Sequence, residues 1–110
     1  MGVTHIVLFQ FKASASADAI KDVCDRMLAL KDICIHPTDQ KPYLKTSIGG
    51  RDNSPEGLQD GITHAFVVEF ENVEDRDYYV NKDPAHLDFV GGLGDVVQKV
   101  QVIDFTNGVF

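Results

Sequence analysis

The stretch Val3-Thr-His-Ile-Val-Leu-Phe-Gln-Phe-Lys12 alternates its side chains in the way that is typical of a β-strand. One face of this strand carries His5, Val7, Phe9 and Phe11. The other face carries Ile6 and Leu8, so both faces are apolar at the middle of the strand. Because strands with two apolar faces are usually covered on both sides, the pattern predicts a central strand.

A second strong strand, Thr63-His-Ala-Phe-Val-Val-Glu-Phe70, alternates in the same way and carries His64 and Phe66 on one face. The remaining elements follow from helical spacing and from capping residues. The predicted strands are 3–12, 43–48, 63–70 and 97–105, and a loop is predicted over 49–61. One helix is predicted from Ser14 or Ser16 to about Ile35, a second over 73–81, and a third that begins at Pro84. The order β-α-β-β-α-β predicts an α+β protein with the ferredoxin-like fold, built on a four-stranded antiparallel sheet.

Two expectations follow for the sheet. We expect the first and third strands to be adjacent, central and parallel to each other, which would place His5 and His64 side by side, ~5 Å apart. Helices should cover one face only, leaving Ile6, Leu8 and Val67 on the other. Because an open apolar face of this size requires a partner, we predict a homodimer in which sheet packs against sheet.

Composition excludes several classes of protein. With 110 residues the chain is expected to form a single domain, residues 1–110. Its 17 acidic and 10 basic residues give a net charge of −7, which argues against nucleic-acid partners and anionic membranes. We expect a cytoplasmic protein, because the chain has neither a signal-peptide pattern nor a membrane-spanning run. No dinucleotide or haem motif is present, so no cofactor is expected.

The segment from Asp77 to Val90 holds the strongest candidates for chemistry, since it joins an aromatic pair, a proline and a histidine. His86 is the candidate general base, because a partly desolvated imidazole stays neutral and can accept a proton. Tyr79 could donate a hydrogen bond to a substrate carbonyl, and Tyr78 is its rival because the register of this helix is open by one position.

The chain resembles the stress-responsive A/B barrel family, a branch of the dimeric α+β barrel superfamily. The motifs that carry the resemblance are His5-Ile6-Val7-Leu8-Phe9 with Phe11-Lys12, Thr63-His64-Ala65 leading to Glu69-Phe70, Asp83-Pro84-Ala85-His86 with Phe89-Val90, and Val102-Ile103-Asp104-Phe105. The resemblance implies a dimeric barrel. It also implies cofactor-independent, aldol-type chemistry like that of a plant polyketide cyclase in the family, with a tyrosine and a histidine matching Tyr79 and His86. Further pocket histidines of that cyclase match His5 and His64.

Departures from the cyclase pattern leave the substrate open. One extra residue separates Tyr79 from Pro84, and Met27 stands where the cyclase has a tyrosine. Two functions therefore fit: an enzyme acting on a small hydrophobic carbonyl compound, and a non-catalytic dimer that binds a hydrophobic ligand or serves in stress response. An open cavity that reaches His86 would favour the enzyme. A cleft filled by Met27, Phe9, Phe66 and Phe89 would favour the second function.

Zinc on His5, His64 and His86 is disfavoured, because no His-x-His pair and no obvious carboxylate accompany them. Glu69 and Asp104 are expected to be barrel-rim or interface charges rather than acid–base groups.

Overall fold

The computed structural model describes residues 1–110 and contains four strands and three helices. Their bounds are β1 Val3–Phe11, α1 Ala17–Ile33, β2 Leu44–Arg51, β3 His64–Phe70, α2 Val73–Asn81, α3 Pro84–Gly91 and β4 Val97–Phe105. Ser16, Asn72 and Asp83 cap the three helices through their side-chain oxygens. The predicted ferredoxin-like α+β fold is confirmed, with the second helical segment divided into α2 and α3 ahead of Pro84.

The strand order is β2-β3-β1-β4, and every neighbouring pair is antiparallel. The central position of β1 and β3 is confirmed, but the predicted parallel pairing of these two strands is wrong. The α1 crossover returns the chain so that β2 runs in the direction of β1, and the loop after β2 then reverses the chain into β3. His64 therefore lies opposite Phe9, whereas His5 lies opposite Val68, towards the other end of the sheet.

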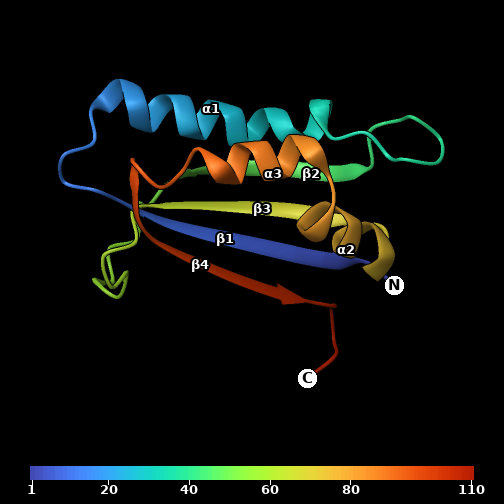
Figure 1. Cartoon of the computed structure of the whole chain (residues 1–110). Coiled ribbons are helices and arrows are strands. Elements are labelled where there is room, and N and C mark those ends of the chain that lie inside the picture. Colours follow the sequence, from blue (N-terminus) through green and yellow to red (C-terminus); the bar gives the residue numbers. More distant parts are fainter.

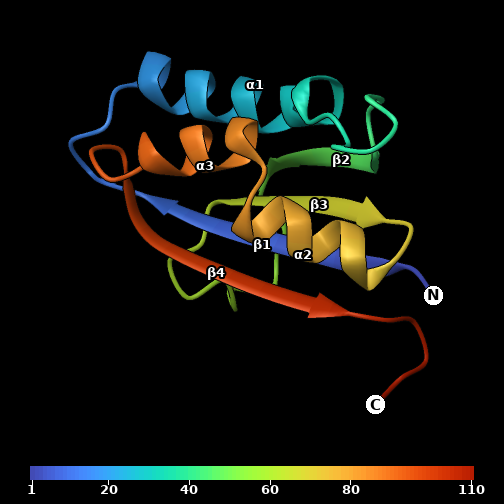
Figure 2. The ribbon, with the colours of Figure 1, turned by 45° about the vertical axis from the view of Figure 1, so that its right-hand side comes forward.

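All three helices lie on one face of the sheet (Figure 1). Helix α1 packs against β2 and α3, and α2 lies over the end of the sheet where β1 begins (Figure 2). The core fills the space between the helices and the sheet. Its most deeply buried apolar side chains are Phe9, Met27, Leu30, Cys34, Phe66, Val68, Phe70 and Tyr79.

Two boundaries differ from the predicted ones by more than one residue. Helix α1 ends at Ile33 rather than near Ile35, since Ile35 instead pairs with Pro42 in an isolated bridge. Strand β2 runs through Gly49 to Arg51, and the loop predicted over 49–61 therefore begins only after Arg51. Glycine is required at position 49 because a Cβ there would lie 2.1 Å from the ring of Phe66.

The face of the sheet that the helices leave uncovered carries the predicted apolar side chains. Ile6, Leu8 and Val67 are half-buried there. Ile103, directly opposite Ile6, is 60% exposed, and Ile48, opposite Val67, is 59% exposed. These residues form one continuous apolar surface across all four strands, which we call the open sheet face.

Candidate active site

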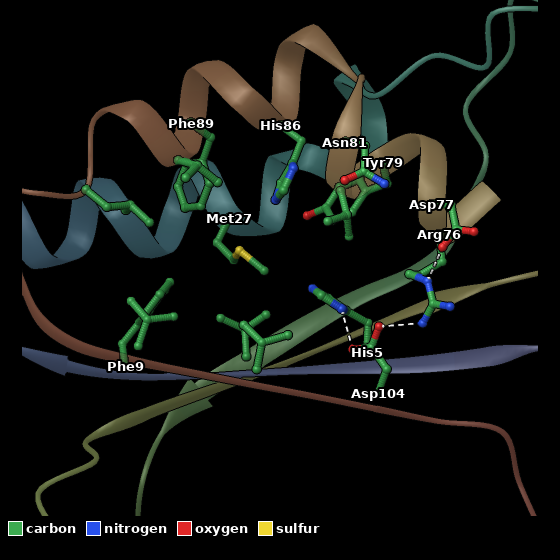
Figure 3. Close-up of a pocket in the computed structure, with 16 residues that line it drawn as sticks. His5, Phe9, Met27, Arg76, Asp77, Tyr79, Asn81, His86, Phe89 and Asp104 are labelled. Carbon is green, nitrogen blue, oxygen red and sulfur yellow. Dashed lines mark hydrogen bonds and ion pairs between the residues drawn. The ribbon is translucent and has the colours of Figure 1, made fainter. Parts of the chain in front are cut away.

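A cavity of about 590 Å³ lies between the sheet and the helices, at the side of β1 that faces β4 (Figure 3). Of the eight side chains proposed for the site, six line it: His5, Phe9, Met27, Tyr79, His86 and Phe89. The cavity is therefore open rather than filled by Met27, Phe9 and Phe89, which instead form part of its wall.

The cavity has a polar end and an apolar end. Along each of β1, α3 and β4 the lining side chains change from polar to apolar between these two ends. Along β1 the lining changes from His5 to Phe9, and along α3 it changes from His86 to Phe89. Strand β4 contributes Asp104 at the polar end, and Val102 and Val100 line the cavity further along the strand. The four-residue step from His5 to Phe9 corresponds to about 13 Å of strand. The space therefore suits an elongated molecule with one polar group.

Tyr79 and His86 are stacked at the polar end, with ring centroids 3.9 Å apart and an interplanar angle of 29°. Tyr79 is completely buried. Neither its hydroxyl oxygen nor the Nδ1 atom of His86 has a hydrogen-bond partner within the protein. Buried polar atoms nearly always have a partner, so these two unpartnered atoms make this end of the cavity a candidate site for chemistry. The tyrosine in the cavity is Tyr79, whereas Tyr78 points to Tyr43 and His36.

Burial sets the protonation of both groups. It lowers the pKa of His86, with the backbone of Tyr79 partly offsetting that effect, so the imidazole is neutral at pH 7. Burial also raises the pKa of Tyr79, so its hydroxyl keeps its proton. The arrangement therefore places a proton acceptor beside a proton donor, which is the pairing that general acid–base chemistry requires.

His5 faces this pair from the sheet, and its orientation is fixed from behind. Its Nδ1 atom lies 2.6 Å from a carboxylate oxygen of Asp104. The other oxygen of Asp104 accepts a hydrogen bond of 2.8 Å from Arg76. Since Nδ1 is engaged, Nε2 is the ring nitrogen left to point into the cavity (Figure 3). His5 also packs edge-on against Tyr79, with centroids 5.8 Å apart.

The expectation that Asp104 is a rim or interface charge is wrong, because its carboxylate lies beside the cavity and bonds His5. The sequence held a usable signal. In the ferredoxin-like order the last strand pairs with the first, and Asp104 continues the row of Val100 and Val102 into the cavity. The sequence did not point to Arg76, because a charged residue in the polar sequence of α2 is typical of a solvent-exposed helix face.

A second buried carboxylate holds the start of α3. One oxygen of Asp83 accepts hydrogen bonds from the backbone N–H groups of Ala85 and His86, and the other accepts the hydroxyl of Tyr43. Asp83 is 1% exposed. Burial, followed by the charge of Asp83, raises the pKa of the neighbouring Cys34 thiol to about 12. Three segments of the chain thus meet at Asp83, which caps the helix that carries His86.

Two of the proposed residues lie elsewhere. His64 and Phe66 do not line this cavity, and the expected convergence of three histidines does not occur. The cause is the antiparallel register, which puts His64 at the end of the sheet where β1 finishes. Nowhere in residues 1–110 do three His, Cys, Asp or Glu side chains form a group with metal-ligand geometry. No helix is long and apolar enough to span a membrane.

An antiparallel four-stranded sheet with helices on one face, and a cavity holding histidine and tyrosine between them, defines a ferredoxin-like α+β protein. The chain belongs to the stress responsive A/B barrel domain (Dabb) family, whose model matches residues 3–107.

Relatives of known name cover nearly the whole chain. The stress-response A/B barrel domain-containing protein HS1 of Arabidopsis thaliana is 32% identical, over 94% of this chain and 87% of its own length. Olivetolic acid cyclase of Cannabis sativa is 28% identical, over 96% of this chain and 97% of its own. The solved structure of hydroxynitrile lyase from Passiflora edulis superposes with a TM-score of 0.83 at 27% identity, covering 99% and 96% of the two chains. The family thus includes relatives named as a cyclase and a lyase.

A further solved structure shares the fold. It is a dimeric ferredoxin-like protein of unknown function from Jannaschia sp. CCS1, with a TM-score of 0.77 at 17% identity, covering 96% of this chain and 99% of the other.

Proposed function

We propose that the protein is a cofactor-independent homodimeric enzyme that acts on a small hydrophobic carbonyl compound by acid–base chemistry of the cyclase or lyase type. The observation that carries this proposal is the stacked pair of Tyr79 and His86, whose hydroxyl oxygen and Nδ1 are buried and unpartnered at the polar end of the cavity.

His86 acts as the general base. Its neutral imidazole removes a proton from the carbon next to the substrate carbonyl, and the electron pair of that C–H bond moves towards the carbonyl oxygen. Tyr79 keeps its proton and donates a hydrogen bond to this oxygen as negative charge grows there, which stabilises the enolate. His5, held by Asp104, orients the polar end of the substrate through Nε2. These three groups come from three elements that the core packing holds in place.

In an aldol-type cyclisation the enolate carbon then attacks a second carbonyl of the same molecule. One C–C bond forms, and the oxygen of the second carbonyl takes the proton that His86 had removed. The apolar end of the cavity, from Phe89 to Val100, binds the rest of the substrate. The same groups, operating in the reverse order, cleave a C–C bond, so cyclase and lyase activities need the same site.

The homodimer buries the open sheet face. A soluble chain that exposes Ile48, Ile103 and Phe105 on one surface gains free energy by covering them. Pairing of two such faces leaves both cavities on the outside, under their own helices. The Ile103→Asp variant should therefore run as a monomer in sizing with light scattering, while the unchanged protein runs as a dimer. A monodisperse monomer of the unchanged protein at micromolar concentration would contradict the proposal.

The base can be tested without knowing the substrate. In deuterated buffer the protein should accelerate exchange of the hydrogens next to the carbonyl of 2-nonanone, followed by NMR. The His86→Gln variant should lose about 10²- to 10⁴-fold of that acceleration, the usual contribution of a positioned base. Tyr79→Phe should lose a similar share, while Tyr78→Phe, which removes a hydroxyl outside the cavity, should retain the rate. Exchange at the rate of buffer, or an unchanged rate in His86→Gln, would contradict the role of His86.

The alternative function, a non-catalytic dimer that binds a hydrophobic ligand, rests on the wide apolar part of the same cavity. It predicts that 2-nonanone binds and shifts the resonances of Phe89 and Val100 without any exchange of its hydrogens. Metabolites that co-purify with the protein, identified by mass spectrometry, would then name the ligand class.

A further inference from the structure

A second cavity, of about 650 Å³, lies at the other end of the space between helices and sheet. Its walls are the first half of α1, the ends of β1 and β2, and the beginning of β3. The rings of Phe9 and Phe66, with centroids 5.7 Å apart, stand between the two cavities. Phe9 lines the first cavity and Phe66 lines the second, so the two spaces are separate sites.

The charges around the second cavity are of one sign. Lys12, Lys21 and Arg51 line it, and none of its lining residues is an Asp or Glu. The chain as a whole has 17 acidic and 10 basic residues. Lys21 is paired with Asp25, but Lys12 and Arg51 make no ion pair. A cluster of unneutralised cations on an acidic protein raises the local concentration of anions.

The lining of the cavity combines apolar and polar side chains. Phe11, Ile20, Leu28 and Phe66 supply much of the apolar surface. His64 lies edge-on against Phe11, with centroids 5.0 Å apart. Its Nδ1 atom is 2.8 Å from the hydroxyl of Thr63, which leaves Nε2 without a partner in the protein.

Burial and the charge of Arg51 both lower the pKa of His64, so its ring is neutral at pH 7. A neutral imidazole carries a single N–H. In the tautomer in which Nδ1 accepts the hydroxyl hydrogen of Thr63, Nε2–H is the donor that can bind an anion. The guanidinium fork itself matches the geometry of a carboxylate.

We propose that this cavity is a second binding site, for an amphipathic organic carboxylate. Its carboxylate binds near Arg51 and Lys12 with a hydrogen bond from His64, and its apolar body packs on Phe11 and Phe66. The site is independent of the chemistry proposed at His86, because the Phe9–Phe66 wall separates the two and no residue lines both cavities.

Octanoate is a suitable probe, and octan-1-ol of the same chain length is its neutral control. In an NMR titration of the full chain, octanoate should shift the ring signals of His64 and Phe11, and it should bind several-fold tighter than octan-1-ol. Raising the salt from 0.01 M to about 0.5 M should weaken octanoate but not octan-1-ol, since salt screens partly exposed charges.

Arg51→Gln and Lys12→Gln should each weaken octanoate about fivefold, the effect of one partly exposed ion pair. Lys41→Gln is the matched control, because it removes the same charge at an exposed position outside both cavities and should leave affinity unchanged. The proposal is overturned if octanoate shifts His86 and Tyr79 but not His64, if octan-1-ol binds as tightly as octanoate, or if Arg51→Gln binds octanoate as well as the unchanged protein does.

Discussion

The two ends of the space between helices and sheet share one backbone plan but carry different chemistry. At the end where β1 begins, His5 faces the stacked pair of Tyr79 and His86, and the nearby carboxylate of Asp104 is already neutralised by Arg76. At the end where β1 finishes, a single histidine, His64, lies among cations that have no acidic partner in the cavity.

The difference shows that strand direction decides which side chains lie together in a site. His5 and His64 each stand near the start of a central strand and on the same face of the sheet. Parallel strands would have brought the two rings together, whereas antiparallel strands place them at opposite ends. One reversal of direction thus produces two cavities with one sheet histidine each, in place of one cavity with two.

The largest expected change in stability comes from a substitution at Phe9, in the wall between the two cavities. Phe9 is 1% exposed and packs on both Phe11 and Phe66. Phe9→Ala should lower the free energy of unfolding by about 3–5 kcal/mol, because removal of a buried ring leaves a void that neighbours refill only partly. Urea denaturation measures it. Leu58→Ala, at a position 80% exposed, is the control and should change stability by less than about 0.5 kcal/mol.

A loss below about 1 kcal/mol in Phe9→Ala would mean that the ring is not part of a packed wall. If the variant is folded enough for titration, octanoate should also shift His86 as well as His64, because the two cavities become one.

Much of the fold could be predicted from the sequence because its signals are local. Alternation marks β1 and β3, and the residues Asn72, Asp83 and Pro84 mark the starts of α2 and α3. The end of β2 could not be predicted in this way. Gly49 reads as a turn residue, and only the ring of Phe66 packed across from it explains why a strand passes there.

The site residues that lie close together in the sequence could be predicted, whereas those that are brought together by strand pairing could not. Tyr79 and His86 come from neighbouring helices with short spacing, and both line the cavity. His64 was misplaced because the parallel pairing expected for β1 and β3 conflicts with the antiparallel sheet that the ferredoxin-like order predicts; the direction of β3 follows from the order of the elements and not from its own residues. Asp104 was expected only as a rim or interface charge, because its partner His5 is 99 residues away and their contact follows from the pairing of β4 with β1.

The second prediction concerns Asp83, the N-cap of α3, whose replacement should affect only the cavity that holds His86. Asp83→Ala removes the cap from two backbone N–H groups and leaves the hydroxyl of Tyr43 without its partner. The loss of a cap and of a buried hydrogen bond together should cost about 2–4 kcal/mol. Asp88→Ala, an exposed position on the same helix, should cost less than about 0.5 kcal/mol.

NMR of the histidine rings separates the two ends in this variant. The signals of His86 should shift, because the first turn of α3 loses its anchor, while those of His64 should stay in place. Equal shifts of both rings would show that Asp83 supports the whole core rather than the start of α3.

The smallest expected effect is a change in the pH dependence of stability, and here the two ends should behave alike. The pKa values of His86 and His64 are both lowered in the folded protein, chiefly by burial. Between the ordinary histidine value of about 6.5 and the lower folded value, the unfolded chain binds more protons than the folded one. Stability is therefore fully present above about pH 6.5 and is lost as the pH falls through the folded pKa values.

His86→Asn and His64→Asn should each make this acid-side decline shallower, because each removes one group that the folded state resists protonating. Thermal unfolding midpoints collected from pH 7.5 down to pH 4.5 provide the measurement, with each variant compared to the unchanged protein by slope rather than by absolute midpoint. One variant could keep the pH slope of the unchanged protein while the other flattens it. The histidine replaced in the first variant would then be hydrated in the folded protein, because water would enter the cavity at its end of the sheet.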